Sequence, residues 1–107
     1  MTIRAHAEAI AQRTAIPLVE VLAFLSIVMP LIVDCLNRRR TPEELEEYFR
    51  QDTLATRKVI RKACNRAYRK EHNMDAPKSL VLAVQHQFAT MPPGGMRKLL
   101  YDGIISA

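Results

Sequence analysis

Three histidines are the side chains of this 107-residue sequence best suited to acid–base catalysis or metal binding. His6, His72 and His86 lie on three separate predicted helices, each on the polar face. None belongs to a ligand pattern such as H-x-x-x-H or E-x-x-H, which would place two metal ligands on one helix face. We therefore predict three surface histidines, no metal site and no cofactor.

The carboxylates Glu43 and Glu47 are four residues apart, a spacing that places both on one helix face. They follow Thr41-Pro42, which is typical of a helix start, where the helix dipole favours negative charge. The dipole explains these carboxylates better than acid–base catalysis does. Gly94-Gly95 lacks the preceding strand and the lysine of a phosphate-binding loop. The sequence therefore predicts no catalytic residues and a protein that is not an enzyme.

Cys35 and Cys64 are far apart in the sequence, and no secretory signal pattern precedes them. Free cysteine behaves as a small, readily buried hydrophobic residue, and disulfides are rare in reducing compartments. We predict two reduced, buried thiols in a cytoplasmic protein.

Charge is segregated along the chain, whose formal net charge is +5. Residues 41–52 carry five acidic side chains and one arginine, whereas residues 53–72 carry seven Lys or Arg and one glutamate. Such blocks of like charge are typical of surfaces that meet a partner of opposite charge. The basic block is therefore the first candidate for a binding surface.

In the predicted helix over residues 53–72, apolar side chains share one face and cations share the other. The cationic side chains are the candidate site for a polyanion or an acidic partner: Lys58, Arg61, Lys62, Arg66, Arg69 and Lys70. Cations along one helix face can follow nucleic-acid phosphates, but Tyr68 is the only aromatic residue here to support base stacking. The alternative is a solvated face, or a strip that pairs with the acidic segment 43–52 of the same or a neighbouring chain.

Residues 16–36 form the most apolar stretch. A helix that is apolar on every side must be enclosed by protein or by lipid. The part free of charged residues, 21–33, has 13 residues and is about 20 Å long as a helix, which is short for a hydrocarbon core of about 30 Å. We predict enclosure by the chain's own helices, completed where needed by a second copy, with membrane attachment as the alternative. The expected oligomer or core contacts are Leu22, Phe24, Leu25, Val28 and Ile32.

Prolines and threonines indicate where the helices begin and end. Pro30 removes a hydrogen bond inside the apolar helix, so we expect a kink or break there and two segments, about 17–29 and 30–39. Thr41 is the expected N-cap of the next helix, with a capping-box glutamate three residues later. Asp52 is the expected cap of the helix over 53–72, unless the preceding helix simply continues.

Helical spacing also predicts helices over residues 2–15, 77–91 and 96–105. In 77–91 the apolar residues share a face, except for Leu82, which falls on the polar side. The resulting fold class is all-α: a single domain over 1–107, built as a small orthogonal bundle of five or six helices around a proline-kinked apolar central helix.

We predict a non-enzymatic interaction or assembly subunit, either a homo-oligomer or part of a larger protein assembly. It would self-associate through its apolar helices and present the basic helix 53–72 to an acidic partner. A nucleic-acid-binding module that uses this helix on the phosphate backbone is the first alternative. A membrane-attached accessory protein, held through residues 16–36, is the second. No small-molecule substrate is inferred.

Overall fold

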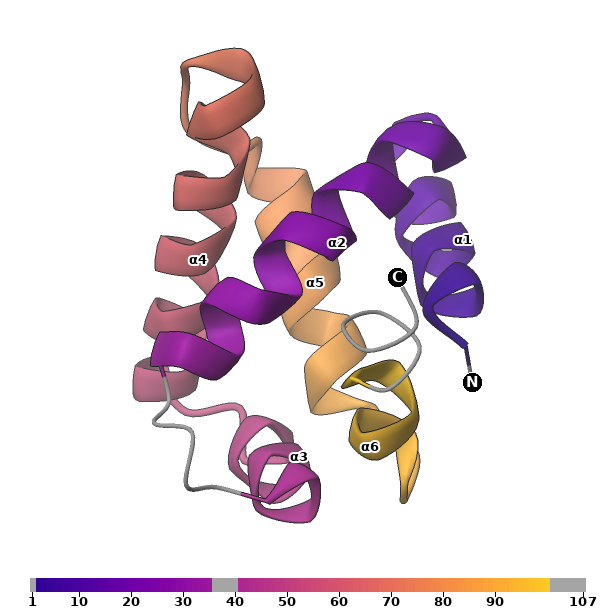
Figure 1. The fold of residues 1–107 in the computed structure, drawn as a ribbon, viewed down its shortest axis with the longest axis vertical. Helices are drawn as coiled ribbons and strands as arrows, with labels where there is room; N and C mark the ends of the chain where they lie inside the picture. Colours follow the sequence, from indigo (N-terminus) through magenta and orange to yellow (C-terminus); the bar gives the residue numbers. More distant parts are fainter. Residues whose placement is uncertain (1, 36–40, 101–107) are drawn as a thin grey trace.

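The computed structural model describes residues 2–35 and 41–100, and this part of the chain contains six α-helices and no β-strand (Figure 1). The helices are α1 (Ile3–Thr14), α2 (Leu18–Cys35), α3 (Pro42–Arg50), α4 (Leu54–His72), α5 (Lys78–Ala89) and α6 (Gly95–Leu100). The predicted all-α fold is therefore confirmed. The predicted helix over 96–105 extends past the described residues.

Threonine hydroxyls cap three of these helices. The side chains of Thr2, Thr41 and Thr53 each accept a hydrogen bond from the backbone N–H three residues later, at 3.1, 3.2 and 3.2 Å. Such a cap satisfies one of the N–H groups that a helix start leaves without a partner. The Thr41 prediction is confirmed, but the predicted cap of α4 is wrong. Asp52 adopts a left-handed φ of 50° and pairs with Arg57, so the hydroxyl that reaches the helix belongs to Thr53.

Helix α2 runs without a break from Leu18 to Cys35, so the predicted division at Pro30 into segments 17–29 and 30–39 is wrong. The kink at Pro30 is not confirmed either. Proline removes one N–H donor from the helix ladder. Val28 and Ile32, on either side of it, are 0% and 1% exposed, and burial of such side chains offsets the lost hydrogen bond.

One face of α2 is buried and the other is open to solvent. Val19 is 72% exposed, and Ala23 and Ser26 are also exposed. Figure 1 shows α2 crossing in front of α5, with no other described helix in front of it. Within the described residues, the chain's own helices therefore cover α2 on one side only, and a single copy does not enclose it. That a second copy completes the enclosure stays a prediction.

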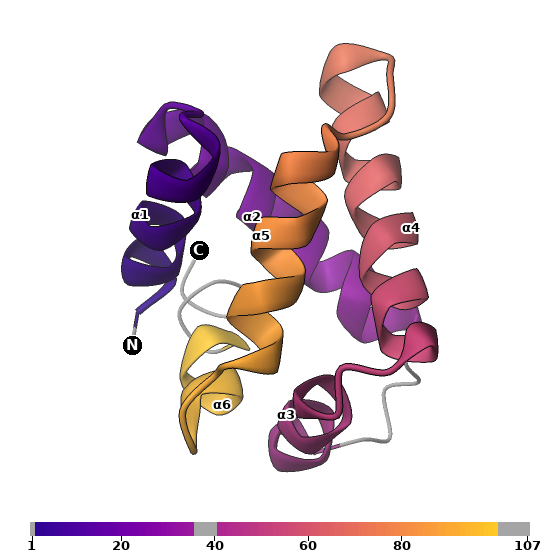
Figure 2. The same ribbon diagram turned by 180° about the vertical axis from the view of Figure 1, so that it is seen from behind.

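The core lies between α2 and a layer formed by α1, α4 and α5 (Figures 1 and 2). Helix α2 packs against α1 and α4, while α5 packs against α1, α3 and α4. The rings of Phe49 and Phe88 stack with centroids 5.0 Å apart and join α3 to α5. Helix α6 packs against α3. The apolar faces predicted for α4 and α5 are the faces that this arrangement buries.

His6 is buried, so the prediction of a surface histidine is wrong at this position. Its Nδ1 lies 2.9 Å from Oε1 of Gln87 on α5, and its Nε2 has no partner among the described residues. Desolvation lowers the pKa of His6 more than the Gln87 hydrogen bond raises it, which favours the neutral ring. The reason is that α1 is covered from two sides, by α2 and α5. His72 and His86 are exposed, as predicted.

Candidate interaction surfaces

The six cations predicted to form a binding site all lie at exposed positions of α4. We call them the cationic face: Lys58, Arg61, Lys62, Arg66, Arg69 and Lys70. The opposite side of α4 is buried, and its alanines and Cys64 are small enough to let α4 approach its neighbours closely. From Lys58 to Lys70 the helix rises about 18 Å. The structure therefore brings the predicted residues together on one rigid element.

The acidic residue Glu46 of α3 is buried and bonded to the other end of the chain. Its Oε1 accepts the N–H of Met96 at 3.0 Å, and its Oε2 accepts the N–H of Gly94 at 3.3 Å and Nη2 of Arg50 at 3.0 Å. Burial alone would raise the pKa of this carboxyl, but the three donors together hold it below its usual value. Glu46 thus caps the start of α6.

Glu43 and Asp52 form two-point ion pairs with arginines outside the cationic face. Arg97 donates to Glu43 at 2.7 and 2.8 Å, and Arg57 donates to Asp52 at 2.9 and 2.8 Å. The arginine hydrogen bonds lower the pKa of both carboxyls. Glu47 is paired in turn with Arg50 at 3.2 Å.

Most cations of the cationic face therefore keep their charge uncompensated. Arg69 donates to Asp75 at 2.6 Å. Within residues 2–35 and 41–100, the others have no ion-pair partner: Lys58, Arg61, Lys62, Arg66 and Lys70. Among the described residues, the acidic segment 43–52 forms one ion pair with α4, between Asp52 and Arg57, so it does not neutralise the cationic face.

A groove lies between the cationic face and the exposed side of α5. This α4–α5 groove has a volume of about 440 Å³. Its lining residues are Arg61, Asn65, Asp75, Ala76, Lys78, Val81, Leu82 and Gln85. A second hollow of about 290 Å³ continues it toward Thr90 and shares Leu82 and Gln85 with it. Leu82, the residue that breaks the apolar pattern of α5, is 63% exposed and stands where the two hollows meet.

The solvent side of α2 forms a second surface of different character. Exposed and half-buried side chains recur there at helical spacing, and all but one serine are apolar; we call them the outer stripe of α2: Val19, Leu22, Ala23, Ser26, Pro30 and Val33. The exposed carboxylates Glu20 and Asp34 flank this stripe. The hydroxyl of Ser26 donates to the carbonyl of Leu22 at 3.0 Å, which satisfies its hydrogen without a partner outside the helix. Monomeric proteins rarely leave contiguous apolar surface uncovered.

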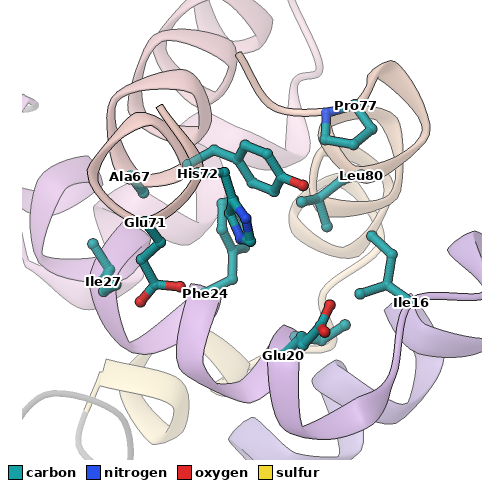
Figure 3. A pocket seen from close by; sticks show the side chains of 11 residues that line it. Ile16, Glu20, Phe24, Ile27, Ala67, Glu71, His72, Pro77 and Leu80 are labelled. Atoms are coloured by element: carbon teal, nitrogen blue, oxygen red, sulfur yellow. The ribbon is translucent and has the colours of Figure 1, made fainter. Parts of the chain in front are cut away.

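A small pocket of about 100 Å³ lies where α2, α4 and α5 meet (Figure 3). The ring of Tyr68 packs edge-on against Phe24 at 6.4 Å and stacks on His72 at 4.1 Å. Glu20 and Glu71 also line the pocket, and Figure 3 shows Phe24 and His72 between them. Carboxylates beside aromatic rings suit a cationic group, and this volume admits no more than one small group.

Other chemistry has little structural support. Burial raises the pKa of the free Cys64 thiol to about 12, so it is not a nucleophile at neutral pH. Across residues 2–35 and 41–100, no three His, Cys, Asp or Glu side chains could hold a metal ion. No single helix in those ranges is long and apolar enough to cross a membrane. Helix α1 and residues Leu18–Asp34 reach the required length and hydropathy only when taken together, and they are bent by 119° relative to each other.

Of the five residues predicted as oligomer or core contacts, Phe24, Leu25, Val28 and Ile32 lie in the core, and Leu22 is half-buried. Sequence reasoning missed the exposed Val19 and Ala23 beside them. A signal existed, since both recur with Ser26 at three- and four-residue spacing. Comparison with protein-family models, with curated proteins and with solved structures finds no match for this sequence.

Proposed function

We propose that this chain is a non-enzymatic interaction module that binds an acidic partner through the cationic face of α4. The observation that carries the proposal is the distribution of ion pairs. Three of the four acidic side chains of α3 are paired with arginines: Glu46 and Glu47 with Arg50, and Glu43 with Arg97. By contrast, five cations of α4 have no ion-pair partner in the described ranges. Uncompensated charge on one rigid face attracts an oppositely charged partner and speeds its association.

We propose further that the module self-associates through the outer stripe of α2. The stripe covers about 21 Å of helix, from Val19 to Val33. Its small residues, Ala23 and Ser26, lie at the middle, where two helices crossing at a two-fold axis approach most closely. A second copy would remove Val19 and its neighbours from water.

The first experiment measures binding of fluorescent poly-L-glutamate by anisotropy, at about 50 and 300 mM salt. We expect binding that weakens with salt. The variant Lys62→Gln/Arg66→Gln removes two cations of the face that do not line the α4–α5 groove. Two exposed charge pairs at about 0.5 kcal/mol each amount to a roughly fivefold loss of affinity.

The matched control is Arg4→Gln/Lys98→Gln, which removes two exposed cations from α1 and α6. It has the same net charge and is expected to bind almost as tightly as the parent chain. Equal losses in the two variants would show that only the net charge matters, and no binding at low salt would refute the proposal. If a DNA oligomer of equal charge binds more tightly than poly-L-glutamate, the proposed partner is a nucleic acid and not an acidic protein.

The second experiment measures the mass in detergent-free buffer by size-exclusion chromatography with light scattering. We expect a mass above the 12.2 kDa of one chain. Ala23→Glu should reduce the mass to that of a monomer, because it places a charge in the middle of the stripe. Gln12→Glu, an exposed position on α1, is the control. A monomeric parent chain would refute self-association and leave the first proposal standing.

A further inference from the structure

The α4–α5 groove places one exposed apolar side chain between cations. Leu82 is 63% exposed, and Val81 beside it is buried at 8%. Arg61 and Lys78 line the groove from α4 and α5. A singly exposed leucine, such as Leu54, is normal on a protein surface, but Leu82 also lines a hollow that a partner side chain could fill.

We infer that this groove binds an amphipathic helix of a partner protein, with leucine-like side chains on one face and carboxylates beside them. The inference rests on the proposed function, because it names the kind of acidic partner that the cationic face attracts. Recognition of an amphipathic helix in an apolar groove is an established mode of binding.

The size of the groove suits such an occupant. Its two hollows follow α5 from Lys78 to Ala89, a rise of about 17 Å, which corresponds to about three turns of a docked helix. Leu82 lies near the middle of this length, where the anchor of a helical partner makes its largest contact.

The groove is also held in its open shape by hydrogen bonds between its two sides. The side-chain amide of Gln85 donates to the carbonyl of Arg57 at 3.3 Å, and Oδ1 of Asn65 accepts the N–H of Ala76 at 3.1 Å. These bonds fix α4 relative to α5 and to the turn before it. A partner would therefore spend little free energy on ordering the site.

The charges of the groove favour carboxylates in its occupant. Its own acidic side chains are already engaged, Asp75 by Arg69 and Asp52 by Arg57. Arg61 and Lys78 have no ion-pair partner among the described residues. A nucleic acid is disfavoured, because His86 is the one ring among the residues that line the two hollows and offers little surface for base stacking. The groove also presents the apolar side chain of Leu82 to its ligand.

The test uses a fluorescent peptide of about 14 residues, with leucine at i, i+3, i+4 and i+7 spacing and glutamate elsewhere. A peptide of the same composition with scattered leucines is its control. We expect the full chain to bind the first peptide more tightly. Leu82→Asp should weaken that binding roughly tenfold or more, because it removes the apolar anchor.

Leu54→Asp is the matched control, since it places the same charge at another exposed leucine, which lines neither hollow of the groove and lies outside the outer stripe. Lys78→Glu should weaken binding, and Lys98→Glu on α6 should not. Equal binding of the two peptides, or equal effects of Leu82→Asp and Leu54→Asp, would show that the groove is not the binding site. If poly-L-glutamate still binds in that case, the proposal that the cationic face binds an acidic partner is retained, and only the proposal of a helix-binding groove is rejected. Loss of poly-L-glutamate binding as well would refute the proposed function itself.

Discussion

Helices α3 and α4 follow one another in the chain and use their charges in opposite ways. In α3, Glu46 is buried under three donors and Glu43 is held by Arg97. In α4, Lys58, Lys62 and Arg66 face solvent without an ion-pair partner in the described ranges. Most carboxylates of the acidic helix are thus engaged within the fold, whereas five cations of the basic helix have no ion-pair partner in the described ranges. Charge segregation in a sequence therefore does not by itself identify a binding surface. A charged segment is a candidate only if the oppositely charged segment of the same chain does not neutralise it in the fold.

The largest effect is expected from Glu46→Ala. The substitution leaves the N–H groups of Gly94 and Met96 without their acceptor, so it should lower the free energy of unfolding by about 2–3 kcal/mol. Urea denaturation followed by circular dichroism measures this. Glu47→Ala is the control, because the one ion pair of that exposed residue within residues 2–35 and 41–100 is with Arg50, and its loss should cost under about 1 kcal/mol. Equal losses would remove the distinction between the two carboxylates of α3.

The pH dependence of stability sharpens the comparison further. Because the folded-state pKa of Glu46 lies below its ordinary value of 4.5, its contribution to stability is complete above pH 4.5. It should be lost as the pH falls from there through the folded-state pKa. Denaturation midpoints between pH 6 and about pH 3 should therefore fall less steeply in Glu46→Gln than in the parent chain. If the denaturation midpoints of Glu46→Gln and of the parent chain fell in parallel with pH, the lowered pKa of Glu46 would be contradicted.

The smallest effect on stability is expected from the cationic face. Lys62→Gln/Arg66→Gln should change the free energy of unfolding by no more than about 0.5 kcal/mol, because neither side chain has an ion pair among the described residues. The same urea titration measures it. A loss comparable with that of Glu46→Ala would mean that these cations support the fold instead of a partner.

The fold class, most of the helix ranges and the buried faces of α4 and α5 could be predicted from the sequence, because they depend on local spacing and local caps. The buried Glu46 could not, since its donors lie at Gly94 and Met96, far along the chain. His6 was placed on the surface for the same reason. Its burial depends on Gln87 and on how α5 covers α1.

For the apolar stretch 16–36, the sequence predicts burial but not its extent. Composition correctly indicates that α2 supplies much of the core, but it cannot tell enclosure on all sides from burial on one. That difference depends on how many helices the chain can place around α2. Val19 in the outer stripe and Leu82 on α5 leave apolar side chains exposed to water, and the proposed contacts start from these residues.

The most direct test of the central claim is a titration of the ¹⁵N-labelled chain with poly-L-glutamate, followed by two-dimensional NMR. The account predicts that the amide signals of residues 58–70 of α4 shift the most and that those of α3 stay in place. Shifts as large in α1, α3 and α6 as in α4, or none at all at low salt, would contradict it.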